Sequence, residues 1–122
     1  MSRLHESLRS FLAVEGVRTA ALIDVATGMI VRSVGPPDPD LPATAARVAD
    51  EARAVRSALK AAGAADDLIE ITATIGSRLH VSRILRRSPS DGLLLFVDLE
   101  RAKSNLGLAT LRVGQLAPAV LA

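Results

Sequence analysis

The residues of this sequence best suited to chemistry lie in the stretch "IEITATIGSRLHVSRILRR", residues 69–87. It contains His80, one of two histidines, with Ser82 two residues later. A serine-type hydrolase needs a histidine as general base beside a nucleophile and an acid in one cleft. The alternating pattern predicts strands, so Ser82 and His80 lie on a sheet and not on a strained turn. We therefore expect no catalytic residue here and no enzyme.

Other motifs for catalysis or ligand binding are absent from the sequence. It contains no G-x-S-x-G nucleophile turn and no G-x-x-x-x-G-K-[ST] phosphate loop. The two histidines, His5 and His80, are far apart in sequence and form no H-x-H or H-E-x-x-H pattern, so they make a poor zinc site. The chain has no cysteine, which excludes disulfides and thiolate metal sites. We expect neither a cofactor nor a metal.

Arginines make the second half of the same stretch basic, which raises the question of nucleic acid. The residues concerned are Arg78, Arg83, Arg86 and Arg87. Binding of single-stranded nucleic acid favours aromatic side chains on which bases stack, and this chain has no Trp or Tyr. Its net charge is +2. We expect no nucleic-acid partner and interpret Arg86 and Arg87 as solvated, whereas Arg83 falls among apolar neighbours.

Length and composition indicate one domain, 1–122, with an aliphatic core. At 122 residues the chain has no room for two cores and a linker. Apolar residues make up 49% of it, and only Phe11 and Phe96 are aromatic. No apolar run approaches the roughly 20 residues of a membrane span. Charges are scattered through 1–16, unlike a secretion signal. We therefore expect a cytoplasmic protein without direct membrane insertion.

The remaining sequence predicts helices and strands that position the stretch. Residues 17–35 alternate about Ala26-Thr27-Gly28, which indicates a hairpin, and three prolines make 36–40 a loop. Residues 91–99 are apolar almost throughout, which is typical of a central strand covered on both faces. The expected elements are a helix at 3–14, hairpin strands within 17–35, a helix at 41–62, strands at 67–75, 79–87 and 91–99, and a helix at 100–116.

This order, α-β-β-α-β-β-β-α, predicts an α+β fold. Consecutive strands joined by short turns form an antiparallel sheet, and helices must cover both of its faces. The last helix carries a second apolar stripe, with Leu108 and Leu111, beside the stripe that contains Ala109 and Val113. A helix that is apolar over so much of its circumference is expected to contact more than one neighbour.

Three stretches, in order and at matching spacing, resemble the roadblock/LC7 family. "VEGVRTAALIDVATGMIV" (14–31) is similar to that family's opening strand, which ends in Asp, and to its T-G turn. "DLIEITATIGSRLHVSRIL" (67–85) resembles its third and fourth strands. "FVDLERAKSNLGLATLRV" (96–113) resembles its final strand and helix. The resemblance covers almost the whole chain.

The resemblance implies a profilin-like sandwich in which the first and last helices cover one face of a five-stranded antiparallel sheet and the long middle helix covers the other. It implies a homodimer whose third strands pair edge to edge while the middle helices pack beside each other across the twofold axis. It also implies a non-catalytic scaffold or regulator of a Ras-like small GTPase in a bacterial signalling complex, with a sensor-kinase-like protein as a further partner.

The residues themselves also favour such a dimer. Between 67 and 75 there is no Pro or Lys, and only Glu70 is charged after the opening Asp pair, so the usual protection of a sheet edge is missing. One stripe of the middle helix combines small and basic residues. The predicted dimer interface comprises Ala49, Ala52, Arg53, Arg56, Lys60, Ile69, Ile71 and Ala73.

Two registers are possible for the hairpin around residues 76 and 77. A two-residue turn pairs Ala73 with His80 and Glu70 with Arg83. A three-residue loop instead pairs Ala73 with Val81, places apolar on apolar, and moves His80 to a more polar face with Thr72, Thr74 and Ser82. We prefer the three-residue loop, although the other register would give Glu70 and Arg83 a cross-strand ion pair.

A different function class remains open beside the GTPase regulator. A small-molecule-sensing domain of similar α/β shape would enclose a pocket. The scarcity of aromatic residues and the alanine-rich helices favour a tight core without one. A cavity lined by several convergent polar groups would reverse this preference.

Overall fold

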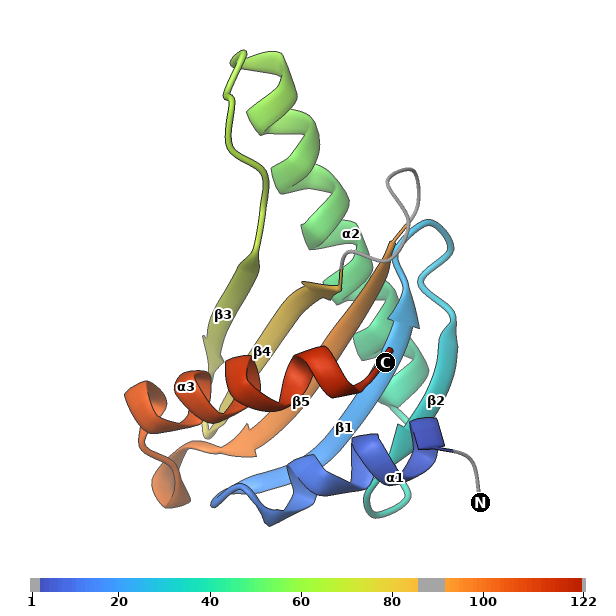
Figure 1. The fold of residues 1–122 in the computed structure, drawn as a ribbon, viewed down its shortest axis with the longest axis vertical. Coiled ribbons are helices and arrows are strands. Elements are labelled where there is room, and N and C mark those ends of the chain that lie inside the picture. The colour runs from blue at the N-terminus through green and yellow to red at the C-terminus, as the bar shows by residue number, and fades with distance from the viewer. Residues whose placement is uncertain (1–2, 86–91, 122) are drawn as a thin grey trace.

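The computed structural model describes residues 3–85 and 92–121, and these form a three-layered sandwich with one sheet in the middle (Figure 1). The strands are antiparallel neighbours in the order β2-β1-β5-β4-β3. Residues 86–91 lie outside the described residues. They include Arg86 and Arg87, the end of the strand predicted at 79–87 and the start of the strand predicted at 91–99. The elements are α1 (Arg3–Arg9), the 3-10 helix η1 (Ser10–Ala13), β1 (Val17–Asp24), β2 (Ile30–Val34), α2 (Leu41–Ala61), β3 (Glu70–Ile75), β4 (Arg78–Leu85), β5 (Leu93–Glu100), η2 (Arg101–Lys103), α3 (Leu106–Leu116) and η3 (Ala117–Ala119).

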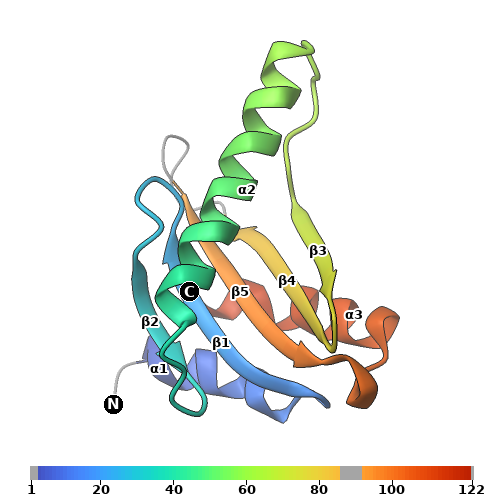
Figure 2. The same ribbon diagram turned by 180° about the vertical axis from the view of Figure 1, so that it is seen from behind.

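Helices cover both faces of the sheet, as the sequence predicts. α1 and α3 lie on one face and α2 on the other (Figures 1 and 2). β5 is the central strand: Leu95 and Val97 are buried in the core beneath α1 and α3, and Leu94 and Phe96 in the core beneath α2. This explains why its sequence is apolar almost throughout. In the described part of the chain, no helix combines the length and apolar character needed to cross a membrane.

The C-terminal segment differs from the single helix expected at 100–116. β5 continues to Glu100, η2 turns the chain, and α3 begins only at Leu106. Asn105 occupies the N-cap, where its side-chain oxygen accepts the N–H of Leu108 at 3.0 Å. A capping Asn begins a helix because it satisfies a backbone donor that has no partner within the helix. The apolar periodicity before residue 105 therefore belongs to a turn.

The preferred register of the β3–β4 hairpin is wrong. The structure has the two-residue turn Gly76-Ser77, with Ile75 opposite Arg78 and Ala73 opposite His80. Gly76 has φ +58° and Ser77 does not have a positive φ, which is the pattern of a type II′ turn. His80 therefore lies with Ala73 on the face of the sheet that α2 covers, whereas Thr72 and Thr74 lie on the other face.

The same register places Glu70 opposite Arg83, and their side chains form the ion pair that the alternative register predicted, at 3.4 Å. Arg83 lies on the α3 face, where its guanidinium approaches Gly114. The two-residue turn was disfavoured because it sets Arg78 and His80 opposite apolar residues. In the folded chain, groups from α2 and β5 provide polar partners for both side chains.

Two glycines give a matched test of backbone constraint. Gly35, after β2, has φ +123°, and a Cβ there would lie against the backbone of Arg18 and 3.1 Å from Thr19 Cα. Gly63, after α2, has φ +69° with open space around it. We expect Gly35→Ala to lower the free energy of unfolding by about 3 kcal/mol and Gly63→Ala by about 1 kcal/mol, since only the first adds a clash to the positive-φ strain. Urea denaturation measures both, and equal losses would contradict the assigned contacts.

Candidate functional site

The third strand lies at an edge of the sheet. β3 pairs with β4 on one side, and no strand of the described chain pairs with its other side. Ile75 and Arg78 flank a two-residue turn and so form a hydrogen-bonded pair, and such pairs alternate along the ladder. The N–H and C=O groups of Glu70, Thr72 and Thr74 therefore point away from β4. They form a row of donors and acceptors available to another strand.

Apolar side chains accompany this open edge. Ile69, directly before β3, is 57% exposed, and Ile75 at its end is 44% exposed. Ile71 and Ala73 are half-buried between them, and Ile71 packs against the core beneath α2. β3 has neither Pro nor Lys. Three predicted interface residues, Ile69, Ile71 and Ala73, thus lie along one edge with the exposure that strand pairing requires.

The long helix α2 has a packed half and a projecting half. Its N-terminal half is buried against the sheet through Leu41, Ala45 and Val48, whereas its C-terminal half extends past the sheet, where Val55 is 37% exposed (Figure 2). Ala49 and Ala52, both predicted for the interface, are fully buried within the monomer. Their small side chains let the helix approach the sheet and present no surface to a partner.

The predicted basic residues of α2 lie beyond this buried stripe. Arg53 is half-buried and donates to the backbone oxygen of Val25 and to Asp50. Arg56 pairs with Asp67 at 3.2 Å, which ties α2 to the segment that leads into β3. Lys60 is exposed near the helix end. The structure therefore places helix and strand residues beside each other, joined by an ion pair.

His80 belongs to a polar network between the sheet and α2. Arg78 Nη2 lies 2.7 Å from Asp98 Oδ2, and His80 Nε2 lies 3.3 Å from Asp98 Oδ1, outside hydrogen-bond geometry but within electrostatic reach. Arg47 of α2 contacts His80 Nδ1 at 2.6 Å and pairs with Glu51. The His80 ring also meets Phe96 edge to face, with centroids 5.0 Å apart.

The contacts of His80 indicate which of its two ring nitrogens carries a proton. A guanidinium can donate hydrogen bonds but cannot accept them, so Nδ1 accepts from Arg47 and the proton resides on Nε2, beside Asp98. Arg47 thus occupies Nδ1, while Nε2 faces Asp98 without a hydrogen bond. Ser82 is 5% exposed on the same strand, which leaves it little access to a substrate. This arrangement joins α2 to the sheet and has no free base beside an accessible nucleophile.

Sequence analysis missed Asp98 and Arg47. The signal for Asp98 was a carboxylate within an otherwise apolar strand, since such a residue is buried only with a partner. Arg47 gave no signal, because its contact with His80 spans 33 residues. His5 lies in α1, on the opposite face of the sheet from His80. Among residues 3–85 and 92–121, no group of three potential ligands could hold a metal ion.

The fold is shared with solved structures. A Roadblock/LC7 domain from Streptomyces avermitilis has a TM-score of 0.79 and 18% identity, over 98% of this chain and 95% of that one. The gliding protein MglB from Thermus thermophilus has a TM-score of 0.77 and 24% identity, over 97% and 85%. MglB from Myxococcus xanthus has a TM-score of 0.78 and 16% identity, over 98% and 93%. The chain has the roadblock/LC7 fold. No family model and no curated protein sequence matches it.

The roadblock/LC7 fold accounts for nearly the whole chain and confirms the expected α+β sandwich. At these identities the likeness establishes architecture alone. The case for a function therefore depends on the surfaces that this roadblock/LC7 fold exposes, the β3 edge above all.

Proposed function

We propose that this chain is a non-catalytic homodimeric scaffold or regulator of a Ras-like small GTPase in a bacterial signalling complex. The observation that carries the proposal is an unprotected β3 edge beside a projecting α2, on a roadblock/LC7 fold. The resemblance in sequence to the roadblock/LC7 family supplies the GTPase as partner class. A sensor-kinase-like protein and a cytoplasmic location belong to the same proposal.

The proposed dimer pairs the β3 edges of two copies around a twofold axis. A closed twofold interface uses the same patch on both subunits, and antiparallel strand addition satisfies the outward N–H and C=O groups. Ile69, Ile71 and Ala73 supply the apolar contacts of this pairing. The projecting half of α2, with Arg56 and Lys60, lies beside the partner's helix.

The proposal predicts that a Ras-like GTPase from the native host responds to this protein. Each such GTPase is expressed singly and mixed with the dimer, and both co-elution and the rate of GTP hydrolysis are measured. We expect one GTPase to co-elute and its hydrolysis rate to change by at least about tenfold, since activation in trans can reach roughly 10³–10⁵-fold. If no Ras-like GTPase of the host co-elutes or changes its rate, the regulator assignment is wrong.

A small-molecule sensor is the second candidate, because of one polar cleft. It has a volume of about 360 Å³ and lies where the start of β1 meets the 36–40 loop and the β3–β4 turn. Both cationic side chains of its lining are already engaged: Arg18 pairs with Glu100 at 3.5 Å and Arg78 with Asp98 at 2.7 Å. A hydrogen bond from Lys103 lowers the pKa of Glu100, so this carboxylate stays ionised.

The sensor is the second candidate because both cations of the cleft already have carboxylate partners. A metabolite would have to displace two carboxylates to reach the guanidinium groups. A thermal-shift screen with anionic metabolites tests it: a ligand that raises Tm in the wild type and not in Arg18→Ala would favour the sensor.

A further inference from the structure

The outer side of α3 is apolar and uncovered. Leu106, Leu108 and Leu111 are 44%, 54% and 57% exposed, and Arg112 is the single charged residue of this helix. The sequence predicts that so apolar a helix contacts more than one neighbour. Within the described chain, its other stripe is buried in the core, but the stripe with Leu108 and Leu111 faces solvent. A solvated helix face normally carries charge, so this surface lacks a neighbour.

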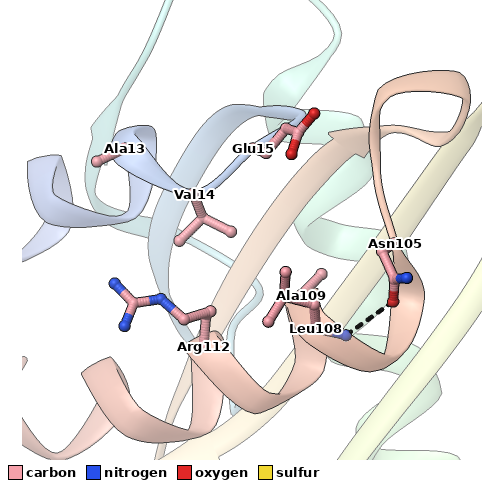
Figure 3. Close-up of a pocket in the computed structure, with 7 residues that line it drawn as sticks. All are labelled: Ala13, Val14, Glu15, Asn105, Leu108, Ala109 and Arg112. Atoms are coloured by element: carbon pink, nitrogen blue, oxygen red, sulfur yellow. Dashed lines mark hydrogen bonds between the residues drawn. The ribbon is translucent and has the colours of Figure 1, made fainter.

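A pocket opens beside these leucines. It has a volume of about 130 Å³ and lies between the segment that enters β1 and the first turns of α3 (Figure 3). Val14, Leu108 and Ala109 form much of its apolar wall. The volume is close to the ~150 Å³ of an apolar cavity that accepts a benzene molecule. The pocket therefore suits one branched aliphatic side chain.

Two opposite charges line the same pocket. Glu15 and Arg112 come from different segments and point in different directions (Figure 3). Arg112 donates to the neutral side chain of Gln115 at 3.3 Å. Neither Glu15 nor Arg112 has an ion-pair partner among the described residues. Arg112 thus offers a cation and Glu15 an anion to a protein that covers the pocket.

We propose that the α3 surface, defined as Glu15, Leu108, Leu111 and Arg112 around this pocket, binds a second copy of this chain across a twofold axis. Leu111 of each copy enters the other's pocket, and Arg112 pairs with the partner's Glu15. An interface around a twofold axis must be self-complementary, and this patch holds an apolar knob, an apolar hole, one cation and one anion. A partner of uniform charge would leave either Glu15 or Arg112 opposite a like charge.

The α3 surface is distinct from the proposed β3 interface. It lies on the opposite face of the sheet from α2 (Figures 1 and 2). Two copies joined through β3 would still expose two α3 surfaces. Use of both contacts would therefore build an assembly larger than a dimer, which closes as a tetramer if the two axes intersect and otherwise continues as a filament.

A charge swap tests this contact separately from strand pairing. All variants carry Ile69→Lys, which removes the proposed β3 interface, and sedimentation equilibrium measures the remaining self-association. In this background we expect a monomer–dimer equilibrium. Arg112→Glu or Glu15→Arg alone sets like charges opposite each other twice, and each is expected to weaken association about tenfold. The double variant restores both pairs and should recover the affinity of the background.

Mixing the two single variants provides the decisive control. Their complementary charges should let them associate with each other more tightly than either does with itself. Leu111→Ser removes the knob without changing charge and should also abolish association. If the background remains monomeric at all concentrations, or if the double variant is as weak as the single ones, the second-copy assignment is wrong, and a different protein covers the surface.

Discussion

Ile69→Lys is expected to convert the proposed dimer of this roadblock/LC7 fold into a species of lower mass. Ile69 is 57% exposed beside the open β3 edge, so the monomer loses little when it is replaced. In the strand-paired dimer, both copies lose a buried isoleucine and gain a charge near the twofold axis. We expect a loss of about 3 kcal/mol, or roughly 100-fold in affinity, from the burial of two aliphatic side chains.

Val31→Lys is the matched control for this variant. Val31 is a β-branched residue, 52% exposed, on β2 at the opposite edge of the same sheet. The substitution adds the same charge to an edge strand, so it reproduces any general effect on stability or solubility. The solution mass of wild type and both variants is measured by light scattering over a range of concentrations. A monomeric wild type, or equal dissociation by both variants, would exclude pairing through β3.

A backbone variant separates strand pairing from side-chain contact. The N–H of Thr72 points away from β4 toward the open edge, so Thr72→Pro removes an outward donor while the ladder to β4 keeps its bonds. We expect this variant to lose self-association through β3 and to remain folded by circular dichroism. Retention of the full wild-type mass would mean that helix contacts, and not the strand, hold these copies together.

The strands and their order follow from local patterns. Alternation over 70–75 and the apolar run of β5 each reflect burial by neighbours that any antiparallel sandwich supplies. The resemblance to roadblock/LC7 sequences added the position of the third strand at a sheet edge and the placement of the helices on the two faces. The same local reasoning failed where a capping residue competes with periodicity, since Asn105 begins α3 inside an apolar stripe that continues on both sides.

The hairpin register was mispredicted for a physical reason. Apolar pairing across two strands favoured a three-residue loop, but His80 and Arg78 are stabilised by Arg47 and Asp98, which come from other elements. A pairwise comparison of β3 with β4 cannot include these long-range partners. The candidate interface was affected in the same way: a stripe read from α2 alone included Ala49, although the sheet already covers that residue.

Among the polar side chains of the monomer, Asp98 is the one whose replacement should lower the free energy of unfolding most. Its side chain is 9% exposed, and it is the one carboxylate near both Arg78 and His80 in the described network. Asp98→Ala leaves the cation of Arg78 beside a cavity without a counter-charge. Removing one partner of a buried pair costs about 3–5 kcal/mol, and the 30% exposure of the Arg78 side chain places the expected loss near 3 kcal/mol.

Glu70→Ala is the control for this prediction, because its pair with Arg83 is longer, at 3.4 Å, and more exposed. We expect that variant to lose at most about 1 kcal/mol in urea denaturation. The combination of Asp98→Leu with Arg78→Leu and His80→Leu replaces the three polar side chains that the sheet contributes to the network, and an apolar replacement should recover much of the stability lost in Asp98→Ala. A triple variant less stable than Asp98→Ala would show that the net attraction within the network exceeds its desolvation cost. Recovery in the triple variant would instead mean that the desolvation cost of these groups offsets most of their mutual attraction.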